Sequence, residues 1–267
     1  MWPIKVPEHI TQFIDKRFTL EELGAKANAA YQTISNGIPE VSVVMPAFNE
    51  EDNILPTLAS LAANKTKRVV EIIVVNNNST DDTEALVRST GVQCILEGRQ
   101  GITFARNSGL AVARGKYILN ADADTIYPAD WIEQMTRPLE NAGVSLTYGR
   151  FAFLPIAETG RGTYFIYEHV ARFSRWINKV FKDEAVNVYG FNSGFRREQG
   201  IAVDGFDHPE GTNEDGWLAL KLRDKGFGKL HLVTDIRALT WTTDRRIQID
   251  GGLIKGSLKR ISRVFGG

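Results

Sequence analysis

Residues 41–50, Val-Ser-Val-Val-Met-Pro-Ala-Phe-Asn-Glu, pass directly from an apolar run into a polar turn. A short apolar run followed by helical spacing, here over residues 50–63, is typical of the first half of a β-α-β unit. The pattern repeats in strand-like runs and helical stretches: strands at 71–75, 92–96 and 116–119, helices at 80–90 and 102–114. This alternation predicts an α/β fold with a doubly wound, mainly parallel sheet flanked by helices.

Three of these strands end in clusters of polar side chains. Pro46 to Glu50 follow the first strand, Asn76 to Asp82 follow the second, and Asn120 to Asp124 follow the fourth. In an open parallel sheet, ligands bind outside the carboxyl ends of the strands. We therefore expect one binding site built from all three clusters. Within the second cluster, Ser79 is predicted to cap the next helix, with Asp82 in its first turn.

Asp122-Ala-Asp124 is the sharpest of these clusters. Two carboxylates two residues apart at a strand end can turn their oxygens toward one hard cation. Mg²⁺ and Mn²⁺ accept such ligands and keep coordination positions for substrate phosphates. The alternative is that both aspartates only cap turns and helices. Their place directly after an apolar strand favours the metal site.

Composition excludes several classes of function. Of the 267 residues, 43% are hydrophobic, which is typical of a globular protein. The 32 Lys and Arg balance 32 Asp and Glu, so the chain has no net positive charge with which to attract nucleic acid. The single cysteine cannot form an internal disulfide, which favours a reducing compartment. No apolar run has the length of a signal peptide or a membrane span. We expect a cytoplasmic protein, or one attached to the inner face of the cell membrane.

The remaining segments divide the chain. Residues 8–35 have helical spacing, end in a turn at 36–39, and are expected to pack on the main domain, with self-association as the alternative. The tail carries Lys and Arg among apolar residues and is predicted either to lie on anionic lipid or to form a plain surface helix. The expected division is a helical N-terminal extension at 1–38, one catalytic domain at 39–246 with halves 39–150 and 151–246, and a basic amphipathic tail at 247–267.

Residues 162–182 predict a long amphipathic helix. One side is apolar and the rest is largely basic: Phe165, Ile166, Val170, Phe173, Ile177 and Val180 against Arg172, Arg175, Lys179 and Lys182. We expect the apolar side to pack in the core and the basic side to face solvent. The alternative is contact with a lipid-linked or anionic substrate.

Several short motifs follow one another along residues 41–246: Pro46-Ala-Phe-Asn-Glu50, Val75-Asn-Asn-Asn-Ser-Thr-Asp-Asp-Thr83, Ala105-Arg-Asn-Ser-Gly109, Ala121-Asp-Ala-Asp124, Gly190-Phe-Asn-Ser-Gly-Phe-Arg-Arg197, Gly205-Phe-Asp207 and Asn213-Glu-Asp215. In order and spacing they resemble the inverting family 2 glycosyltransferases of the GT-A fold. The resemblance implies a nucleotide-sugar donor, a divalent metal (Mn²⁺ or Mg²⁺) and direct displacement at the anomeric carbon. It also implies a carbohydrate or lipid-linked acceptor, and a role in assembling cell-envelope polysaccharide, glycan or glycolipid.

Carried over residue by residue, the resemblance implies four groups of site residues. Asp215 would be the general base, with Glu214 as the alternative. Asp124 would be the principal metal ligand, joined by Asp122. Acceptor contacts would come from Asn192 and Gly194. His208 is a further acceptor candidate by its position in a Gly- and Pro-containing loop before the Glu-Asp motif. The nucleotide sugar would contact Pro46, Ala47, Phe48, Glu50, Asn76, Asn77, Arg106 and Asp122, with Arg106 beside the diphosphate. By its position before the tail, Arg245 is predicted either to close over the diphosphate or to belong to a solvated arginine pair.

Two departures from the family pattern bear on the substrate. Asn76 stands where the family commonly has an aspartate that reads uracil, so uridine, guanosine and thymidine all stay open as the donor base. The Gln-x-x-Arg-Trp motif and membrane helices of processive synthases are absent from the sequence, which points to transfer of a single sugar.

The chemistry of sugar transfer explains these residue types independently of the family resemblance. A carboxylate can take the proton of an acceptor hydroxyl, and a metal with an arginine can neutralise a leaving diphosphate. Asp215 opens an apparent helix, whose dipole favours the ionised carboxylate. Two alternatives stay open: a sugar-phosphate nucleotidyltransferase, for which a Gly-rich basic loop is expected after the first strand, and a non-catalytic nucleotide-sugar binding module.

Overall fold

The computed structural model describes residues 3–14, 18–155, 160–243 and 245. Its centre is a seven-stranded sheet in the order β3 (Gln93–Leu96), β2 (Val70–Asn76), β1 (Val41–Ala47), β4 (Tyr117–Asn120), β8 (Ser193–Arg196), β6 (Val144–Tyr148) and β9 (Lys229–Leu232). β3, β2, β1 and β4 are mutually parallel, and β6 is parallel to β9, whereas β8 runs antiparallel to both of its neighbours. The predicted α/β fold with a mainly parallel sheet is confirmed.

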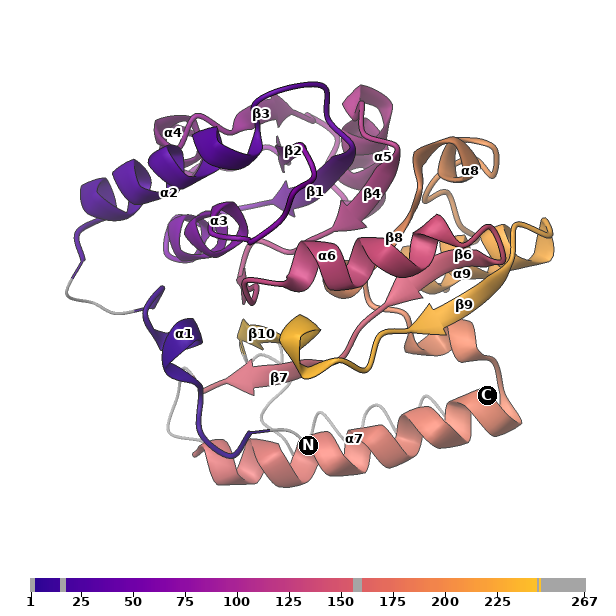
Figure 1. The fold of residues 1–267 in the computed structure, drawn as a ribbon. Helices are drawn as coiled ribbons and strands as arrows, with labels where there is room; N and C mark the ends of the chain where they lie inside the picture. The colour runs from indigo at the N-terminus through magenta and orange to yellow at the C-terminus, as the bar shows by residue number, and fades with distance from the viewer. Residues whose placement is uncertain (1–2, 15–17, 156–159, 244, 246–267) are drawn as a thin grey trace.

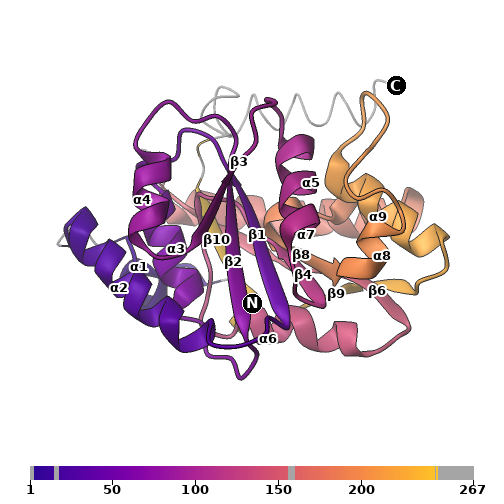
Figure 2. The ribbon, with the colours of Figure 1, turned by 90° about the horizontal axis from the view of Figure 1, so that it is seen from above.

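Helices cover both faces of this sheet, as Figure 2 shows. One face packs against α2 (Leu20–Ile34), α3 (Ile54–Ala62), α4 (Thr83–Ser89) and α6 (Trp131–Thr136). The other face packs against α5 (Ile102–Val112) and α9 (Glu214–Asp224), beside the short α8 (Arg197–Ile201). Strands β1, β2 and β4 are almost fully buried, which is why they read as continuous apolar runs.

A second, three-stranded sheet lies below the first in Figure 1. Its order is β5 (Thr125–Ile126), β10 (Thr240–Thr243) and β7 (Phe151–Leu154). The short helix α1 (Glu8–Thr11) places Ile10 against Trp241 in the core of this sheet. The long helix α7 (Arg161–Phe181) packs Tyr164 against Phe153 of β7, with ring centroids 5.3 Å apart.

The first predicted helix, 8–35, is wrong as one element, because α1 and α2 are separate helices. α2 begins at Leu20 because Thr19 and Glu22 form a capping box: the Glu22 N–H donates to Thr19 Oγ1 at 3.2 Å, and the Thr19 N–H donates to Glu22 Oε2 at 2.8 Å. Leu23 and Tyr31 of α2 belong to the same apolar core as the central strands.

The predicted cap at Ser79 is also wrong. α4 begins at Thr83 with Asp82 in the N-cap position, and Ser79 Oγ instead accepts a hydrogen bond from the Asn49 N–H at 3.0 Å. That contact ties the turn after β2 to the turn after β1. The hydroxyl is therefore used between two loops rather than within a helix.

The orientation of α7 differs from the prediction. Ile166, Val170, Phe173 and Val180, expected in the core, are each more than half exposed. The side of α7 that faces the protein is instead polar and aromatic, because Glu168 accepts hydrogen bonds from the Phe153 N–H (2.8 Å) and from Arg161 (2.7 Å). These buried bonds need their partners in place, so they set the rotation of the helix against β7.

Four 3₁₀ helices complete the described structure: η1 (Arg137–Glu140), η2 (Glu184–Asn187), η3 (Gly190–Asn192) and η4 (Ile236–Ala238). Among the described residues, no helix has the length and apolar character needed to cross a bilayer. The predicted basic tail at 247–267 lies outside the described residues.

Candidate active site

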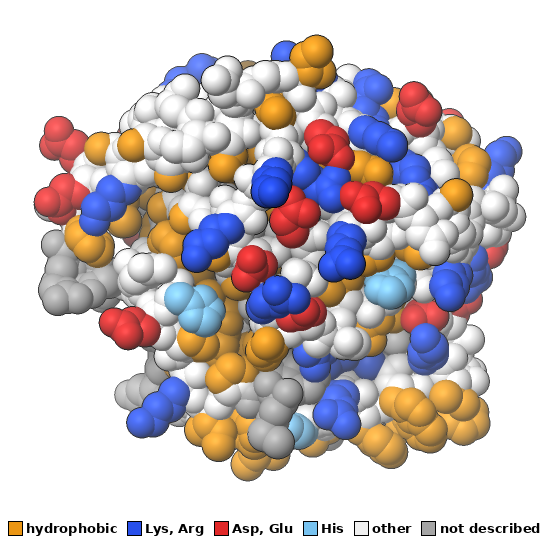
Figure 3. Space-filling model, in the orientation of Figure 1, with side chains coloured by type: hydrophobic (Ala, Val, Ile, Leu, Met, Phe, Trp, Pro, Cys, Tyr) orange, Lys and Arg blue, Asp and Glu red, His pale blue; other side chains and the backbone are white. Residues whose placement is uncertain are grey.

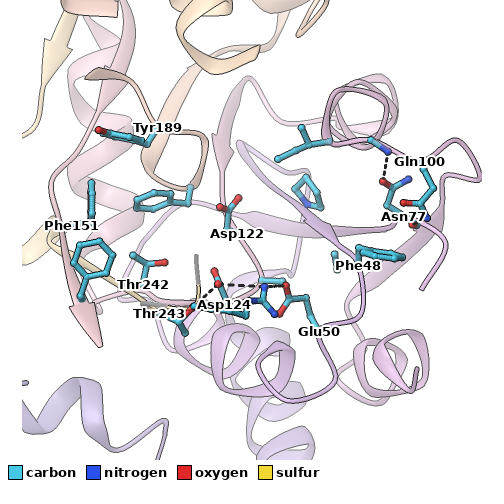
Figure 4. Close-up of a pocket in the computed structure, with 18 residues that line it drawn as sticks. Phe48, Glu50, Asn77, Gln100, Asp122, Asp124, Phe151, Tyr189, Thr242 and Thr243 are labelled. Carbon is cyan, nitrogen blue, oxygen red and sulfur yellow. Dashed lines mark hydrogen bonds and ion pairs between the residues drawn. The ribbon is translucent and has the colours of Figure 1, made fainter. Parts of the chain in front are cut away.

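A pocket of about 460 Å³ lies at the carboxyl ends of β1 and β4, between the two sheets, and Figure 4 shows its interior. The predicted clusters after the first and fourth strands both line it, and the cluster after the second contributes Asn77. The lining residues are Pro46, Ala47, Phe48, Glu50, Asn77, Gln100, Gly101, Ile102, Asp122, Ala123, Asp124, Phe151, Phe153, Tyr189, Phe191, Thr242, Thr243 and Arg245. Its volume suits a small-molecule ligand.

Phe48, Asn77 and Gln100 form one end of the pocket in Figure 4. The Asn77 amide nitrogen donates to the carbonyls of Glu97 (2.9 Å) and Arg99 (2.7 Å), and its oxygen accepts from the Gly101 N–H (2.9 Å). Gln100 Nε2 donates to the Asn77 carbonyl at 2.9 Å. The Asn77 side chain therefore shapes the 97–101 loop, while Phe48 offers a half-exposed ring to a planar ligand.

Asn76 is not part of this pocket. Its amide nitrogen donates to Glu84 Oε2 at 3.0 Å, its oxygen accepts from the Ser79 N–H at 2.9 Å, and the residue is buried. Both ends of the amide are thus used inside the protein. In this conformation, Asn76 supports the turn after β2 rather than contributing to the pocket.

Glu50, Asp124 and Arg245 form a charged cluster at the floor of the pocket. Arg245 donates to Glu50 Oε1, and its Nη2 lies 3.6 Å from Asp124 Oδ2. Asp124 Oδ2 also accepts from Thr243 Oγ1 at 2.7 Å. Burial raises the pKa of Glu50, and the Arg245 guanidinium opposes that rise. The Arg245 guanidinium thus lies next to Asp124, the predicted metal ligand.

Asp122 joins this cluster to a buried ion-pair chain. Arg106 of α5 is 1% exposed, donates to Asp122 Oδ1 at 3.0 Å, and has its Nε 3.6 Å from Asp215 Oδ1. The contact of Arg106 with a diphosphate stays a prediction, and the structure places the residue between two carboxylates. It therefore connects the predicted metal site with the predicted base.

Asp215 lies in the first turn of α9, where Asn213 caps the helix by accepting from the Gly216 N–H at 2.6 Å. Burial, which leaves the side chain 13% exposed, raises the pKa of Asp215 to about 7, with Glu214 and Asp122 adding to the rise and Arg106 opposing it. Within the described residues, Asp215 Oδ1 accepts no hydrogen bond and Arg106 Nε donates none. A base with a pKa near neutrality suits proton abstraction at physiological pH.

This pKa predicts how activity and stability depend on pH. If Asp215 is the base, kcat/KM of the wild type should fall about tenfold per pH unit below pH about 7, because only the ionised carboxylate accepts a proton. The same shift affects stability. The pKa of Asp215 is about 7 in the folded protein and 3.8 as the ordinary value for an aspartate. The protonated side chain therefore contributes its full stabilisation below pH 3.8, and this contribution is lost as pH rises from 3.8 toward 7. The melting temperature of the wild type, relative to Asp215→Asn, should therefore decline from pH 4 to pH 7. Parallel melting curves for the two proteins would contradict the raised pKa.

Gly190 makes room for the contact between Arg106 and Asp215. A Cβ atom at this position would lie 2.5 Å from both carboxylate oxygens of Asp215 and closer still to Arg106. We predict that Gly190→Ala lowers kcat by about 10²-fold, since misplacing a reacting group by about 1 Å has that cost. Steady-state kinetics measure it, and Gly162→Ala, where nothing lies within 4 Å of the added Cβ, is the matched control. Equal losses in both variants would contradict the steric argument.

The predicted acceptor residues are not brought to the pocket. Asn192 is buried: its oxygen accepts from Trp131 Nε1 at 2.8 Å, and its nitrogen donates to the Arg150 carbonyl at 2.9 Å. Gly194 lies inside β8, where a Cβ would meet Leu119. His208 contacts Oγ1 of Thr103, in the first turn of α5, at 3.1 Å. In this structure the first two have structural roles.

Sequence reasoning missed an aromatic wall on the opposite side of the pocket. Phe151 of β7 packs edge-on against Tyr189 and Phe191, with ring centroids 5.3 and 5.0 Å apart, and Phe153 lies 5.4 Å from Phe151. The alternation Phe-Ala-Phe-Leu at 151–154 signals a strand, but only the parallel pairing of β7 with β10 turns this face to the pocket. Such a wall can pack on the apolar face of a sugar ring.

Comparison with known proteins gives one family. The sequence model described as Glycosyl transferase family 2 matches residues 42–199, more than half of the chain. The uncharacterised glycosyltransferase YibD of Escherichia coli K12 is 32% identical over 112 residues, 40% of this chain and 32% of that protein. The E. coli UDP-Glc:alpha-D-GlcNAc-diphosphoundecaprenol beta-1,3-glucosyltransferase WfaP is 30% identical over 115 residues, 42% of this chain and 45% of that protein. The chain thus spans less than half the length of these curated relatives.

Solved structures show the same fold at lower identity. Glucosyl-3-phosphoglycerate synthase from Mycobacterium tuberculosis, in complex with Mn²⁺, UDP and phosphoglyceric acid, has a TM-score of 0.57 at 23% identity over 88% of this chain and 78% of that one. The Pyrobaculum calidifontis mannosyltransferase PcManGT, in complex with GDP-Man and Mn²⁺, has a TM-score of 0.58 at 20% identity over 91% of this chain and 76% of that one. The fold is therefore the GT-A fold.

Proposed function

Because this chain belongs to glycosyl transferase family 2, we propose that it moves a single sugar from a nucleoside-diphosphate sugar to an acceptor hydroxyl, with a divalent metal and with inversion at the anomeric carbon. One observation carries the proposal: a single pocket holds Asp122 and Asp124, and Arg106 links Asp122 to the buried Asp215 directly behind them. Family membership decides against the nucleotidyltransferase alternative.

The pocket suggests how the donor lies. The nucleoside would occupy the end with Phe48 and Gln100, the diphosphate would lie over Asp122 and Asp124, and the sugar would face the aromatic wall. The two carboxylates fit Mn²⁺ or Mg²⁺, which need few protein ligands beside water and phosphate, although no group of three or more ligating side chains occurs among the described residues. When bound, such a metal neutralises charge on the leaving diphosphate.

Asp215 is the proposed base. As the acceptor oxygen bonds to the anomeric carbon, the bond from that carbon to the diphosphate oxygen breaks, and the hydroxyl proton passes to Asp215. Asp215 Oδ1 accepts no hydrogen bond among the described residues, so it has lone pairs left to take up a proton. Glu214, the preceding residue in the same helical turn, is the alternative base.

The acceptor is proposed to be a carbohydrate or a lipid-linked sugar, in assembly of cell-envelope polysaccharide or glycolipid on the cytoplasmic side of the membrane. A relative whose name specifies a diphosphoundecaprenol acceptor supports the lipid-linked case. The aromatic wall supports a sugar acceptor or donor ring, since it offers apolar faces beside polar groups.

A thermal-shift series tests the function. UDP, GDP and dTDP, each with Mn²⁺ and separately with EDTA, should include one nucleotide that raises the melting temperature by several degrees only with metal, since a ligand at about 100 times its Kd stabilises by about 2.7 kcal/mol. The corresponding nucleotide sugar should then be consumed when acceptors are added. Binding without any turnover of the sugar would favour a non-catalytic binding module, and equal shifts in EDTA would contradict the metal.

A further inference from the structure

Helix α7 exposes a continuous apolar stripe that the proposed function does not use. The α7 stripe consists of large apolar side chains on one helix face, each more than half exposed. Five of them lie three or four residues apart, and Phe181 adjoins the last: Ile166, Val170, Phe173, Trp176, Val180 and Phe181. The rings of Phe173 and Trp176 stack with centroids 5.8 Å apart. Figure 3 shows hydrophobic side chains gathered along the lower edge of the molecule, where α7 runs in Figure 1.

The charges beside the α7 stripe have one predominant sign. Residues 161–182 contain five Lys or Arg and a single acidic residue, Glu168. Glu168 is buried and pairs with Arg161 at 2.7 Å, so it does not offset the exposed Arg172 and Lys182. Lys179 pairs with Glu184 at 2.7 Å and still lies at the surface. A helix with an apolar face that carries Phe and Trp and with basic flanks is typical of one that lies in a lipid interface.

Two protein occupants fit the α7 stripe less well. A helix of this length spans about 30 Å and is about 10 Å wide, so a second copy would cover roughly 300 Å² per partner, against about 800 Å² in a typical specific interface. It would also place basic flanks beside basic flanks. The tail of this chain carries Lys255, Lys259, Arg260 and Arg263, so it has the same sign of charge as α7. An anionic surface complements both segments.

We propose that α7 binds the surface of an anionic lipid bilayer, with the α7 stripe among the acyl chains and the basic side chains at the lipid phosphates. Phe153 lines the pocket and also packs on Tyr164 of α7, so the bound orientation would bring the aromatic wall close to the membrane. The proposal does not depend on sugar transfer, and its test uses no donor.

Vesicle co-sedimentation of the full chain tests the proposal. The protein should sediment with vesicles of equal parts phosphatidylglycerol and phosphatidylcholine at low salt, and much less with phosphatidylcholine alone or at high salt. The double variant Val170→Gln with Phe173→Gln should lower the partition coefficient at least about tenfold, because two apolar side chains no longer enter the acyl region. Leu20→Gln with Ile201→Gln, which alters exposed apolar residues on other helices, is the matched control and should bind as the wild type does.

Fluorescence locates the contact. In a variant with Trp2→Phe and Trp217→Phe, brominated lipids should quench Trp176, since the two remaining tryptophans, Trp131 and Trp241, are buried. Adding Trp176→Phe should remove that quenching while binding persists. The tail has no tryptophan. Binding that survives the α7 double variant but is lost when the four basic tail residues become Gln would overturn the proposal. So would an absence of binding by the wild type, or a fall in oligomeric mass on substituting the stripe, which would identify a second copy as its partner.

Discussion

Asp215→Asn should lower kcat by about 10²–10⁴-fold while nucleotide binding stays close to that of the wild type. The amide has nearly the size of the carboxylate but cannot accept the acceptor's proton. Asp215 does not line the pocket and is linked to it through Arg106, which pairs with Asp122, so its loss should affect the chemical step more than donor affinity. Steady-state kinetics and nucleotide titration separate the two effects.

Three comparisons sharpen this test. Glu214→Gln should have a smaller effect on kcat, and Asp224→Asn at the exposed far end of α9 should have none. The variant should also lose the dependence of kcat/KM on a group with a pKa of about 7. Near-wild-type turnover by Asp215→Asn, or retention of the donor's anomeric configuration in the product by NMR, would show that the assignment is wrong.

Asp124→Asn should weaken Mn²⁺-dependent binding of the nucleotide by about 10²-fold or more, and turnover with it. Replacing even a group that only supports a metal ligand typically costs 10–100-fold, so loss of a ligand should cost at least as much. The carboxylate has a defined environment: Thr243 Oγ1 donates to Oδ2 at 2.7 Å, and Arg245 lies 3.6 Å away. Calorimetric titration with UDP or GDP, in Mn²⁺ and in EDTA, measures the effect.

Asp130→Asn is the matched control, because Asp130 lies in the same stretch of chain but outside the pocket, where its side chain makes no capping hydrogen bond. It should bind metal and nucleotide as the wild type does. Equal nucleotide affinity for wild type and Asp124→Asn, both with Mn²⁺ and with EDTA, would remove Asp124 from the metal site.

Much of the fold and part of the candidate site could be predicted from the sequence. Short apolar runs such as Val41–Met45 are buried strands in the structure, and the polar residues after them meet at one edge of the sheet. This worked because a parallel sheet brings strand ends together whatever the details of packing. Phe48, Glu50, Asp122 and Asp124 accordingly line the pocket as predicted from their positions.

Other predicted site residues do not line the pocket, because their side chains have partners elsewhere in the protein. Asn76 and Asn77 are adjacent and chemically identical, and both amides bond within the protein, yet of the two it is Asn77 that lines the pocket. Asn192 satisfies Trp131 in the core instead of facing an acceptor. Which partner an amide finds depends on segments more than 60 residues away for Asn192, and no local pattern encodes that.

The sequence by itself determined the α/β class, the polar clusters that follow the parallel strands and the amphipathic character of residues 162–182. These features follow from the local pattern of apolar and polar residues. Only the tertiary structure decided which way α7 turns and which carboxylates meet. Glu168 rotates the apolar side of α7 to solvent through its bond to the Phe153 N–H. Arg106 brings together Asp122 and Asp215, 93 residues apart, because α5 and the start of α9 pack at the same edge of the sheet. Contacts of this kind depend on long-range packing and on the burial of charge, and both exist only in the folded chain.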